Sequence, residues 1–224
     1  MTHEIEVVRH PRARRMKLSV DNATGQVRLT LPPRAPVGEA MRWAQQQHQW
    51  IARALERRTA PVPFVPGATI LYLGEEVGLG WDSGFPRTPL LDDGQLIGGG
   101  PREGYERRIE RWLRKMALDT LSAETAEFAA RADVTVARVA IGDPKGRWGS
   151  CASSGVIRYS WRLILAPPAV RRATVAHEVA HRVHMNHSPA FHAVVRDIYG
   201  KEPTRERAWL RANAMRLHSY GRDS

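Results

Sequence analysis

Residues 177–192 carry five of the nine histidines in the chain, and this stretch most strongly limits what the chain can fold into. It begins with an HExxH sequence formed by His177, Glu178 and His181. On an α-helix, side chains four residues apart project from one face, about 6 Å apart along the axis. Two neutral imidazoles at this spacing can share a tetrahedral zinc ion, which binds nitrogen at about 2.0–2.1 Å. The stretch therefore predicts a helix that carries a zinc site.

Glu178 lies roughly 100° around the same helix from His177, which places it near the metal without making it an obvious ligand. Its carboxylate could accept a proton from a water molecule that the metal activates, as a general base does in zinc peptidases. The surrounding residues 170–183 are largely apolar, which predicts a buried helix. Buried ionisable groups without partners would be unfavourable, and a metal site removes that difficulty. A loose histidine-rich tract that scavenges metal is the alternative, and it fits a buried helix less well.

A catalytic zinc needs a third protein ligand and one open position. Three nearby side chains are candidates: His184, His187 and His192. If the helix continued, His184 would lie about 10.5 Å along the axis from His177, which is far for one metal ion. Ser188 is a good residue to begin a new helix, so the chain is expected to turn just before it and to fold His187 back. His187 is therefore the favoured third ligand, with His184 and His192 left as alternatives.

Other short segments surround the HExxH sequence. Residues 147–151 read Arg-Trp-Gly-Ser-Cys, residues 155–158 and 161–163 read Gly-Val-Ile-Arg and Trp-Arg-Leu, and residues 186–191 read Asn-His-Ser-Pro-Ala-Phe. In this order the segments resemble the YgjP-like family of bacterial zinc metallopeptidases, relatives of the SprT-like and other minimal gluzincin-type proteases. The resemblance is clearest from about residue 147 to residue 191 and extends more loosely to the arginine-rich N-terminal hairpin.

This resemblance implies roles for four residues. His177, His181 and His187 would bind Zn²⁺, and Glu178 would be the catalytic base of a zinc metallopeptidase. The substrate would be a protein or a peptide. His192 departs from the family pattern, which usually has an aromatic residue there, commonly tryptophan. A histidine at this position could line the site or be a spare ligand.

The second half of the chain predicts a zincin-like catalytic core. Apolar residues recur at helical spacing over about 102–132, which predicts a long backing helix. Strands are expected at 134–141 and 156–164, followed by the HExxH helix and by a last helix over about 204–217. Helix, strand, strand and HExxH helix in this order match the upper half of a zincin fold. The predicted fold class is therefore α+β, with a small β-sheet in the core.

The first 100 residues predict a β-rich region with one helix and a basic hairpin. The expected elements are a hairpin with strands 16–20 and 27–31 around a turn at 21–25, a helix over 37–58, a linker over 59–67, a strand pair over 70–81 that turns at Gly74, and a hairpin over 90–97. We accordingly predict two domains, residues 1–100 as an N-terminal region and residues 101–224 as the metallopeptidase core.

The strand at 156–164 is expected to form a sheet edge beside the zinc, where an extended peptide could add by backbone hydrogen bonds. Catalysis also needs a donor that stabilises the transition state, and three side chains are candidates: Arg147, Tyr159 and Tyr199. The sequence does not select among them. Trp148 and Trp161 are expected to be core or wall residues, and Cys151 a small packed residue beside the site.

The chain is strongly basic. It carries 34 lysine and arginine residues against 23 acidic residues, and 30 of the 34 are arginine. A dense basic run lies on or before the first hairpin: Arg9, Arg12, Arg14, Arg15 and Lys17. Such an arginine-rich surface attracts nucleic acid or another polyanion and binds it in a salt-dependent way. A bias of genome composition toward arginine is the simpler explanation.

The sequence has no stretch of 18 apolar residues, so no membrane span is expected. The first residues lack the apolar segment of a secretory signal, and one cysteine excludes an internal disulfide. These features together favour a cytoplasmic protein.

Two alternatives to a peptidase remain at this stage. A zinc hydrolase of a nucleotide or other phosphate substrate could use the same catalytic centre. A nucleic-acid-binding protein with a structural zinc would need a fourth protein ligand, such as Cys151 or His192, and would leave Glu178 without a role.

Overall fold

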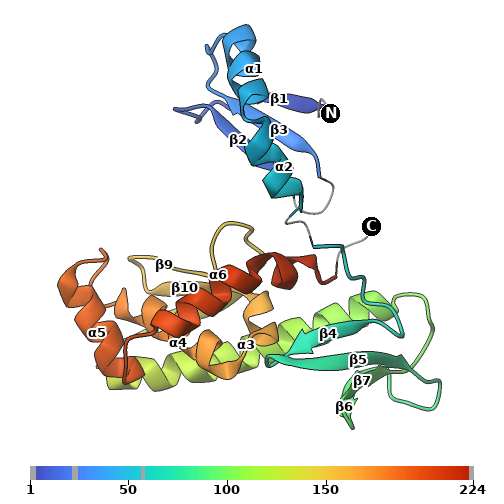
Figure 1. The fold of residues 1–224 in the computed structure, drawn as a ribbon. Coiled ribbons are helices and arrows are strands. Elements are labelled where there is room, and N and C mark those ends of the chain that lie inside the picture. Colours follow the sequence, from blue (N-terminus) through green and yellow to red (C-terminus); the bar gives the residue numbers. More distant parts are fainter. Residues whose placement is uncertain (1–3, 22–24, 57–58, 222–224) are drawn as a thin grey trace. The chain divides into compact units, whose positions relative to one another are not determined.

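The computed structural model describes residues 4–21, 25–56 and 59–221 (Figure 1). The chain divides into two compact units, residues 1–61 with 222–224, and residues 62–221. The described residues form a mixed α+β structure with small sheets, in agreement with the predicted class. Residues 62–100 therefore group with the residues that follow them. The predicted division into an N-terminal region, residues 1–100, and a metallopeptidase core, residues 101–224, stays a prediction.

Unit 1 contains a three-stranded sheet and two helices. Its elements are β1 (Ile5–Arg9), β2 (Lys17–Val20), β3 (Val27–Leu31), α1 (Val37–Gln46) and α2 (His48–Glu56). The predicted hairpin is confirmed, because β2 and β3 pair antiparallel, although residues 22–24 of its turn lie outside the described residues. β1 was not predicted, and it pairs parallel with β3 in the sheet order β1-β3-β2. Leu29 and Leu31 of β3 pack on Ala40 and Ala44 of α1, which forms a small separate core.

The single helix predicted over 37–58 is wrong, because the helix breaks at Gln47. The Gln47 N–H bonds to the Ala44 carbonyl, three residues back, at 3.0 Å, and its ψ of 19° departs from helical values. No glycine or proline stands at this break, and apolar residues recur at helical spacing on both sides of it. Nothing in the sequence therefore indicates that the helix ends there. Residues 57 and 58, at the predicted end of this helix, lie outside the described residues.

Unit 2 begins with a four-stranded sheet in the order β4-β5-β7-β6. Its strands are β4 (Thr69–Tyr72), β5 (Glu75–Trp81), β6 (Leu90–Asp92) and β7 (Gln95–Gly98). Both predicted hairpins are confirmed, and Gly74 makes the first turn with a φ of 89°. The linker predicted over 59–67 is wrong beyond residue 61. Phe64 is fully buried, and Val62 pairs with Tyr220 near the end of the chain.

A long helix and a three-stranded sheet follow. The elements are α3 (Tyr105–Arg131), β8 (Arg138–Gly142), β9 (Gly149–Cys151) and β10 (Val156–Ser160). The long helix is confirmed, and Ile109, Leu113, Leu121 and Phe128 are buried along one side of it. The sheet order is β8-β10-β9, with β8 parallel and β9 antiparallel to β10. β9 was not predicted, and it makes the Arg-Trp-Gly-Ser-Cys segment an edge strand.

Both predicted strands of this sheet need new boundaries. The first starts only at Arg138, because the N–H groups of Ala132 and Val134 still bond to carbonyls of α3. The second ends at Ser160, and Trp161–Leu165 form a buried 3₁₀ helix, η1. The Ser160 hydroxyl accepts a hydrogen bond from the Arg162 N–H at 3.4 Å, which caps η1. A continuous apolar run does not distinguish a strand from a buried helical turn.

Three helices complete unit 2: α4 (Pro168–Ala180), α5 (Pro189–Tyr199) and α6 (Thr204–Ser219). α3 packs against η1, α4 and α5, and it therefore supports the helix that carries the HExxH sequence (Figure 1). The large core formed by these elements contains only residues of unit 2. Among the described residues, no helix is long and apolar enough to cross a membrane.

Candidate metal centre

The HExxH sequence lies at the C-terminal end of α4. Most of this helix is buried, and His177 and Glu178 occupy its last turn while His181 caps it. The regular helix ends at Ala180, and the next N–H groups bond three residues back, that of Arg182 to the Val179 carbonyl at 2.8 Å and that of Val183 to the Ala180 carbonyl at 3.0 Å. A turn therefore follows the second histidine.

A tight return then brings a third histidine to the first two. Ser188 begins α5, and its hydroxyl accepts a hydrogen bond from the Phe191 N–H at 3.3 Å. The return places Nε2 of His187 3.1 Å from Nε2 of His177. His177, His181 and His187 each offer one nitrogen within 4.8 Å of the others. The turn expected before Ser188 is thus present, and His187 is the histidine that it folds back.

Phe191 supports all three imidazoles. This residue is fully buried in the first turn of α5. Its ring centroid lies 4.9 Å from that of His177, 4.5 Å from that of His181 and 4.9 Å from that of His187. Because the phenyl ring packs against each imidazole, it restricts their rotation and keeps the three nitrogens close together.

A backbone hydrogen bond fixes the ring of His181. Its Nδ1 lies 3.0 Å from the carbonyl oxygen of His184. A carbonyl oxygen only accepts, so Nδ1 carries the proton and Nε2 keeps its lone pair. Metal-binding histidines commonly have their second ring nitrogen fixed in this way. His184 thus contributes its backbone, and its ring stays outside the group of three.

The surroundings favour the neutral form of two of these imidazoles, those of His177 and His181. Burial lowers the pKa of His177 to about 4, and the neighbouring His181 and His187 contribute to this shift in the same direction. Burial also lowers the pKa of His181. A metal ion binds neutral imidazole, so near neutral pH the rings of His177 and His181 are already in the form that coordinates a metal.

Glu178 is buried beside the group of histidines, with 6 % of its surface exposed. Burial raises the pKa of its carboxyl group to about 7, and the charge of Arg147 opposes this change. Gly149 of β9 lies directly against it. A Cβ atom at position 149 would be 2.4 Å from Oε1 of Glu178 and 2.5 Å from its Cγ. The carboxylate therefore occupies space that exists only because residue 149 is glycine.

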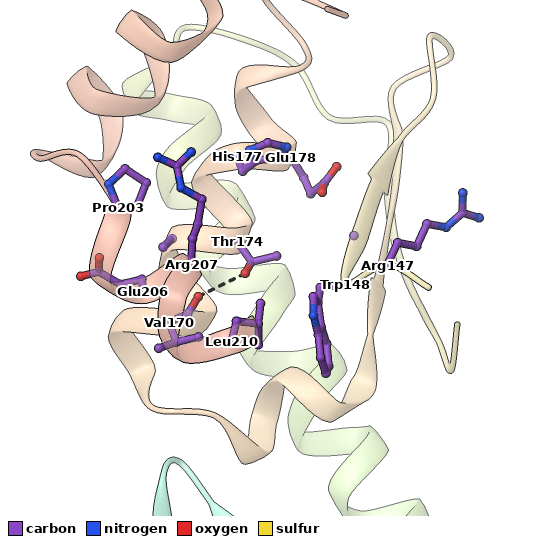
Figure 2. A pocket seen from close by; sticks show the side chains of 12 residues that line it. Arg147, Trp148, Val170, Thr174, His177, Glu178, Pro203, Glu206, Arg207 and Leu210 are labelled. Atoms are coloured by element: carbon purple, nitrogen blue, oxygen red, sulfur yellow. Dashed lines mark hydrogen bonds between the residues drawn. The ribbon is translucent and has the colours of Figure 1, made fainter. Parts of the chain in front are cut away.

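A cavity of about 280 Å³ opens beside His177 and Glu178 (Figure 2). α4, α6 and the strand β9 with the residues before it form its walls. Apolar side chains line much of the cavity, among them Trp148, Val170 and Leu210. In Figure 2 the Glu178 side chain extends from α4 toward the strand, and the Arg207 guanidinium lies on the side of His177. The site thus combines convergent imidazoles, a buried carboxylate and a partly apolar hollow.

A family model described as YgjP-like, metallopeptidase domain, matches residues 14–213. The chain belongs to this family. Neither a curated protein nor a solved structure matches the chain. The resemblance seen in the sequence is thereby confirmed, and membership makes the chain a metallopeptidase, a hydrolase of protein or peptide substrates that uses a metal ion.

The three histidines of this YgjP-like chain fit the metal ion that the family implies. Two nitrogens bound to one tetrahedral zinc at 2.0–2.1 Å lie about 3.3 Å apart. The separation of 3.1 Å between Nε2 of His177 and Nε2 of His187 is close to this value. His192 is set further back, with its ring centroid 6.4 Å from that of His187, and it is not among the residues that could share the ion.

The three candidate transition-state donors lie in different surroundings. The Tyr159 hydroxyl is buried and lies 3.1 Å from Thr125 Oγ1, away from the cavity. The Tyr199 hydroxyl lies 3.1 Å from both the Ala169 carbonyl oxygen and Glu206 Oε1. Arg147 lines the cavity, although its guanidinium points away from the centre in Figure 2.

The other residues expected near the site have simpler positions. Trp161 is buried in the core, and Trp148 lines the cavity while its ring stacks on His218 with centroids 5.0 Å apart. Cys151 is half-buried, and burial raises the pKa of its thiol. The expectation that the strand at 156–164 forms the edge is wrong. β10 is the central strand, because β9 pairs along its other side.

Three contributors escaped the sequence analysis: Gly149, Phe191 and Arg207. Gly149 and Phe191 stand inside segments that carried the family resemblance, but only the fold shows what they touch. Arg207 comes from α6, where its charge helps to lower the pKa of His177. No local pattern marks it among the 30 arginines of the chain.

Proposed function

We propose that this chain is a zinc-dependent endopeptidase with His177, His181 and His187 as metal ligands and Glu178 as general base. The observation that carries the proposal is the convergence of three imidazole nitrogens within 4.8 Å beside a buried carboxylate. Three nitrogen ligands that leave one position open are typical of catalytic zinc sites. The long helix α3, the small sheet and α4 would then form a zincin-like core.

The donor set favours zinc among the divalent metals. Imidazole is a borderline ligand that suits zinc, whereas magnesium and calcium prefer oxygen. A zinc ion held by these residues supplies a Lewis acid that polarises a carbonyl group and lowers the pKa of water. The protein itself supplies the general base, the strand that binds the peptide and the donor that stabilises the transition state.

Glu178 has the properties of a base that works near neutral pH. Burial raises the pKa of its carboxyl group to about 7, and a nearby cation would lower that value. In the proposed reaction an oxygen atom of Glu178 accepts a proton from the attacking water and later gives it to the leaving amine. Among the described residues its carboxylate has no protein hydrogen-bond partner, so it is available for this transfer.

The edge strand β9 is the surface on which a peptide would lie. Its outer side is unpaired among the described strands, and Gly149 at its start contacts Glu178. An extended substrate that adds to this edge would place its backbone along the site, and a neighbouring apolar side chain would enter the cavity. We assign transition-state stabilisation to Arg207, whose guanidinium lies on the His177 side of that cavity (Figure 2).

The structural-zinc alternative receives no support from the geometry. It requires a fourth protein ligand, and neither Cys151 nor His192 belongs to the group of side chains that could share one ion. A buried carboxylate beside the site would also have no purpose there. Hydrolysis of a phosphate substrate remains a chemical alternative that an assay can separate.

The test compares two substrates on one zinc-loaded preparation. Wild-type protein and the Glu178→Gln variant are each offered an unfolded protein, with cleavage sites read by mass spectrometry, and in parallel a nucleoside triphosphate. Glu178-dependent cuts within the polypeptide would support an endopeptidase. Glu178-dependent release of phosphate without peptide cleavage would overturn the proposal in favour of phosphate chemistry.

A further inference from the structure

A second cavity of about 630 Å³ lies on unit 2, along the N-terminal half of α3. Five of the side chains that line it are basic: Arg87, Arg107, Arg108, Arg111 and Lys115. None of the described acidic residues lines it. From Arg111 to Glu124, where α3 meets α4, the distance along the helix axis is about 20 Å. This basic groove is therefore separate from the metal centre.

Within the part of the chain that the structure describes, no carboxylate pairs with an arginine of the basic groove. Across residues 4–21, 25–56 and 59–221, none of its four arginines forms an ion pair, and Lys115 alone pairs, with Asp119. Arginines elsewhere in unit 2, such as Arg162 and Arg171, pair with acidic residues. Like charges gathered in a hollow produce a strong positive potential, which attracts an anionic ligand.

One arginine is fixed in place by the backbone. The Arg108 guanidinium donates to the carbonyl oxygens of Pro101 and Glu103, the latter at 3.2 Å. The start of α3 adds to the positive potential, because Gly104 begins the helix without a side-chain cap and lines the same groove. Part of the positive potential therefore comes from a guanidinium held by the backbone and from the start of α3, and not only from mobile side chains.

The remaining charges form a row with a regular spacing. Arg107, Arg111 and Lys115 are successive residues four apart on α3, so they lie about 6 Å from one another along one face of the helix. Such a row of about 12 Å suits an extended chain that carries one negative charge per repeating unit. A single phosphate group would occupy only one position of the row.

An aromatic side chain borders the same row. Trp112 lines the groove, and it is only partly buried. Its ring packs against that of Tyr72 with the two planes tilted by 47° and the ring centroids 5.2 Å apart. A supported, partly exposed indole beside basic side chains is the arrangement on which an unstacked nucleic-acid base packs.

We propose that the basic groove binds single-stranded nucleic acid, with Arg107, Arg111 and Lys115 along successive phosphates and Trp112 against a base. A duplex is excluded as the preferred ligand because its bases are already stacked on one another and cannot cover Trp112. The inference does not rest on the proposed peptidase activity, because no residue of the groove belongs to the metal centre.

The test measures fluorescence anisotropy of a labelled 20-nucleotide single strand, as DNA and as RNA, with full-length protein. Three phosphate contacts predict a slope of about −2 for log affinity against log salt, or roughly a 20-fold loss between 50 and 200 mM salt. The variant Arg107→Gln/Arg111→Gln should bind at least tenfold more weakly in low salt and should reduce the slope to about −0.7. Trp112→Leu should weaken binding of the single strand without changing that slope.

The matched control is Arg12→Gln/Arg14→Gln, which removes the same charge from exposed positions in unit 1. It should change affinity less than twofold. Circular dichroism and zinc content verify that each variant is folded. The proposal is overturned if the single strand does not bind in low salt, if the control loses as much affinity as the α3 variant, or if a duplex or heparin binds as tightly with the same dependence on Trp112.

Discussion

In the candidate metal centre, a glycine lies directly against the candidate base. A side chain at position 149 would overlap Oε1, Cγ and Cδ of Glu178, each within 2.6 Å of the added Cβ atom. The flexible carboxylate would move, because the backbone of an edge strand paired to β10 is held by its ladder. Gly149 thus fixes the position of the candidate base, although it has no reactive group.

Gly149→Ala should therefore lower the rate of peptide hydrolysis by about 100-fold, because a shift of about 1 Å in a reacting group has an effect of this size. Zinc content should stay near that of the wild type, since the three atoms nearest to the added Cβ atom all belong to Glu178. Gly146→Ala is the matched control, because nothing lies within 4 Å of its added Cβ atom. Equal activities of the two variants would contradict the assigned position of Glu178.

Ionisation of Glu178 should also be measurable as a change in stability. In the metal-free protein its pKa of about 7 lies above the ordinary value of 4.5. A raised pKa contributes stability that is complete below pH 4.5 and is lost as the pH rises through 7. Glu178→Gln should accordingly become more stable than the wild type, by up to about 3 kcal/mol at pH 8.

Urea unfolding of both metal-free proteins between pH 4 and pH 8 checks this expectation. The pKa of His177 is shifted in both proteins, so its contribution cancels in the difference between them. A difference in unfolding free energy that stays constant over this range would show that burial does not raise the pKa of Glu178.

Some residues of the site could be predicted from the sequence, and others could not. The spacing of His177, Glu178 and His181 sets their geometry wherever they stand on a helix, and Ser188 marked the turn that returns His187. The contacts of Gly149 and Phe191 depend on which strand and which helix pack together, which is decided by the whole fold. Their roles could not be read from local sequence.

At the scale of elements, α4 is held on α3 by charged groups as well as by the apolar core. Arg171 bonds to Glu124 with its Nη2 2.9 Å from Oε1, and both side chains are at most 9 % exposed. One helical turn further along α3, Glu127 bonds to Arg172, and these side chains are 38 % and 31 % exposed. The two pairs join the same helices in similar ways but differ in burial.

Removing the buried carboxylate should destabilise the protein far more than removing the half-exposed one. Glu124→Ala leaves Arg171 as an uncompensated buried charge, so we expect a loss of about 3–5 kcal/mol in the free energy of unfolding. Glu127→Ala should lose at most about 1 kcal/mol. Denaturant titration of the two variants provides the comparison, and similar losses would mean that burial of the first pair does not control its contribution.

Helices and strands were predicted correctly where a periodic pattern of apolar residues extends over many residues or a glycine marks a turn. α3, α6 and the hairpins of the β4–β7 sheet were predicted because helical or alternating spacing, or a glycine turn, defines them. β9 escaped because three residues are too few to show alternation. The break between α1 and α2 escaped because no proline or glycine produces it.

At the scale of the whole molecule, the metal centre and its core belong to unit 2 alone. The large core begins at Phe64 and ends at Tyr220, with Val62 paired to Tyr220. Unit 1 has its own small core. The family match begins at residue 14 and therefore includes part of unit 1. Folding of unit 2 should therefore not require unit 1.

A fragment that starts at Pro61 should fold and bind one zinc ion, because every described residue that lines the site is retained. Circular dichroism and zinc stoichiometry, compared with those of the full chain, check this. A fragment that lacks helical structure or does not bind zinc would show that unit 1 is needed for the core to form.

The position of the metal ion tests the proposed catalytic zinc site most directly. Anomalous diffraction at the zinc edge, from crystals of the zinc-loaded protein, locates the ion and its ligands. We expect one ion at about 2.0–2.1 Å from the Nε2 atoms of His177, His181 and His187, with no fourth protein ligand. An ion that is also bound by Cys151 or His192, or held by a different set of side chains, would contradict a catalytic zinc at this site.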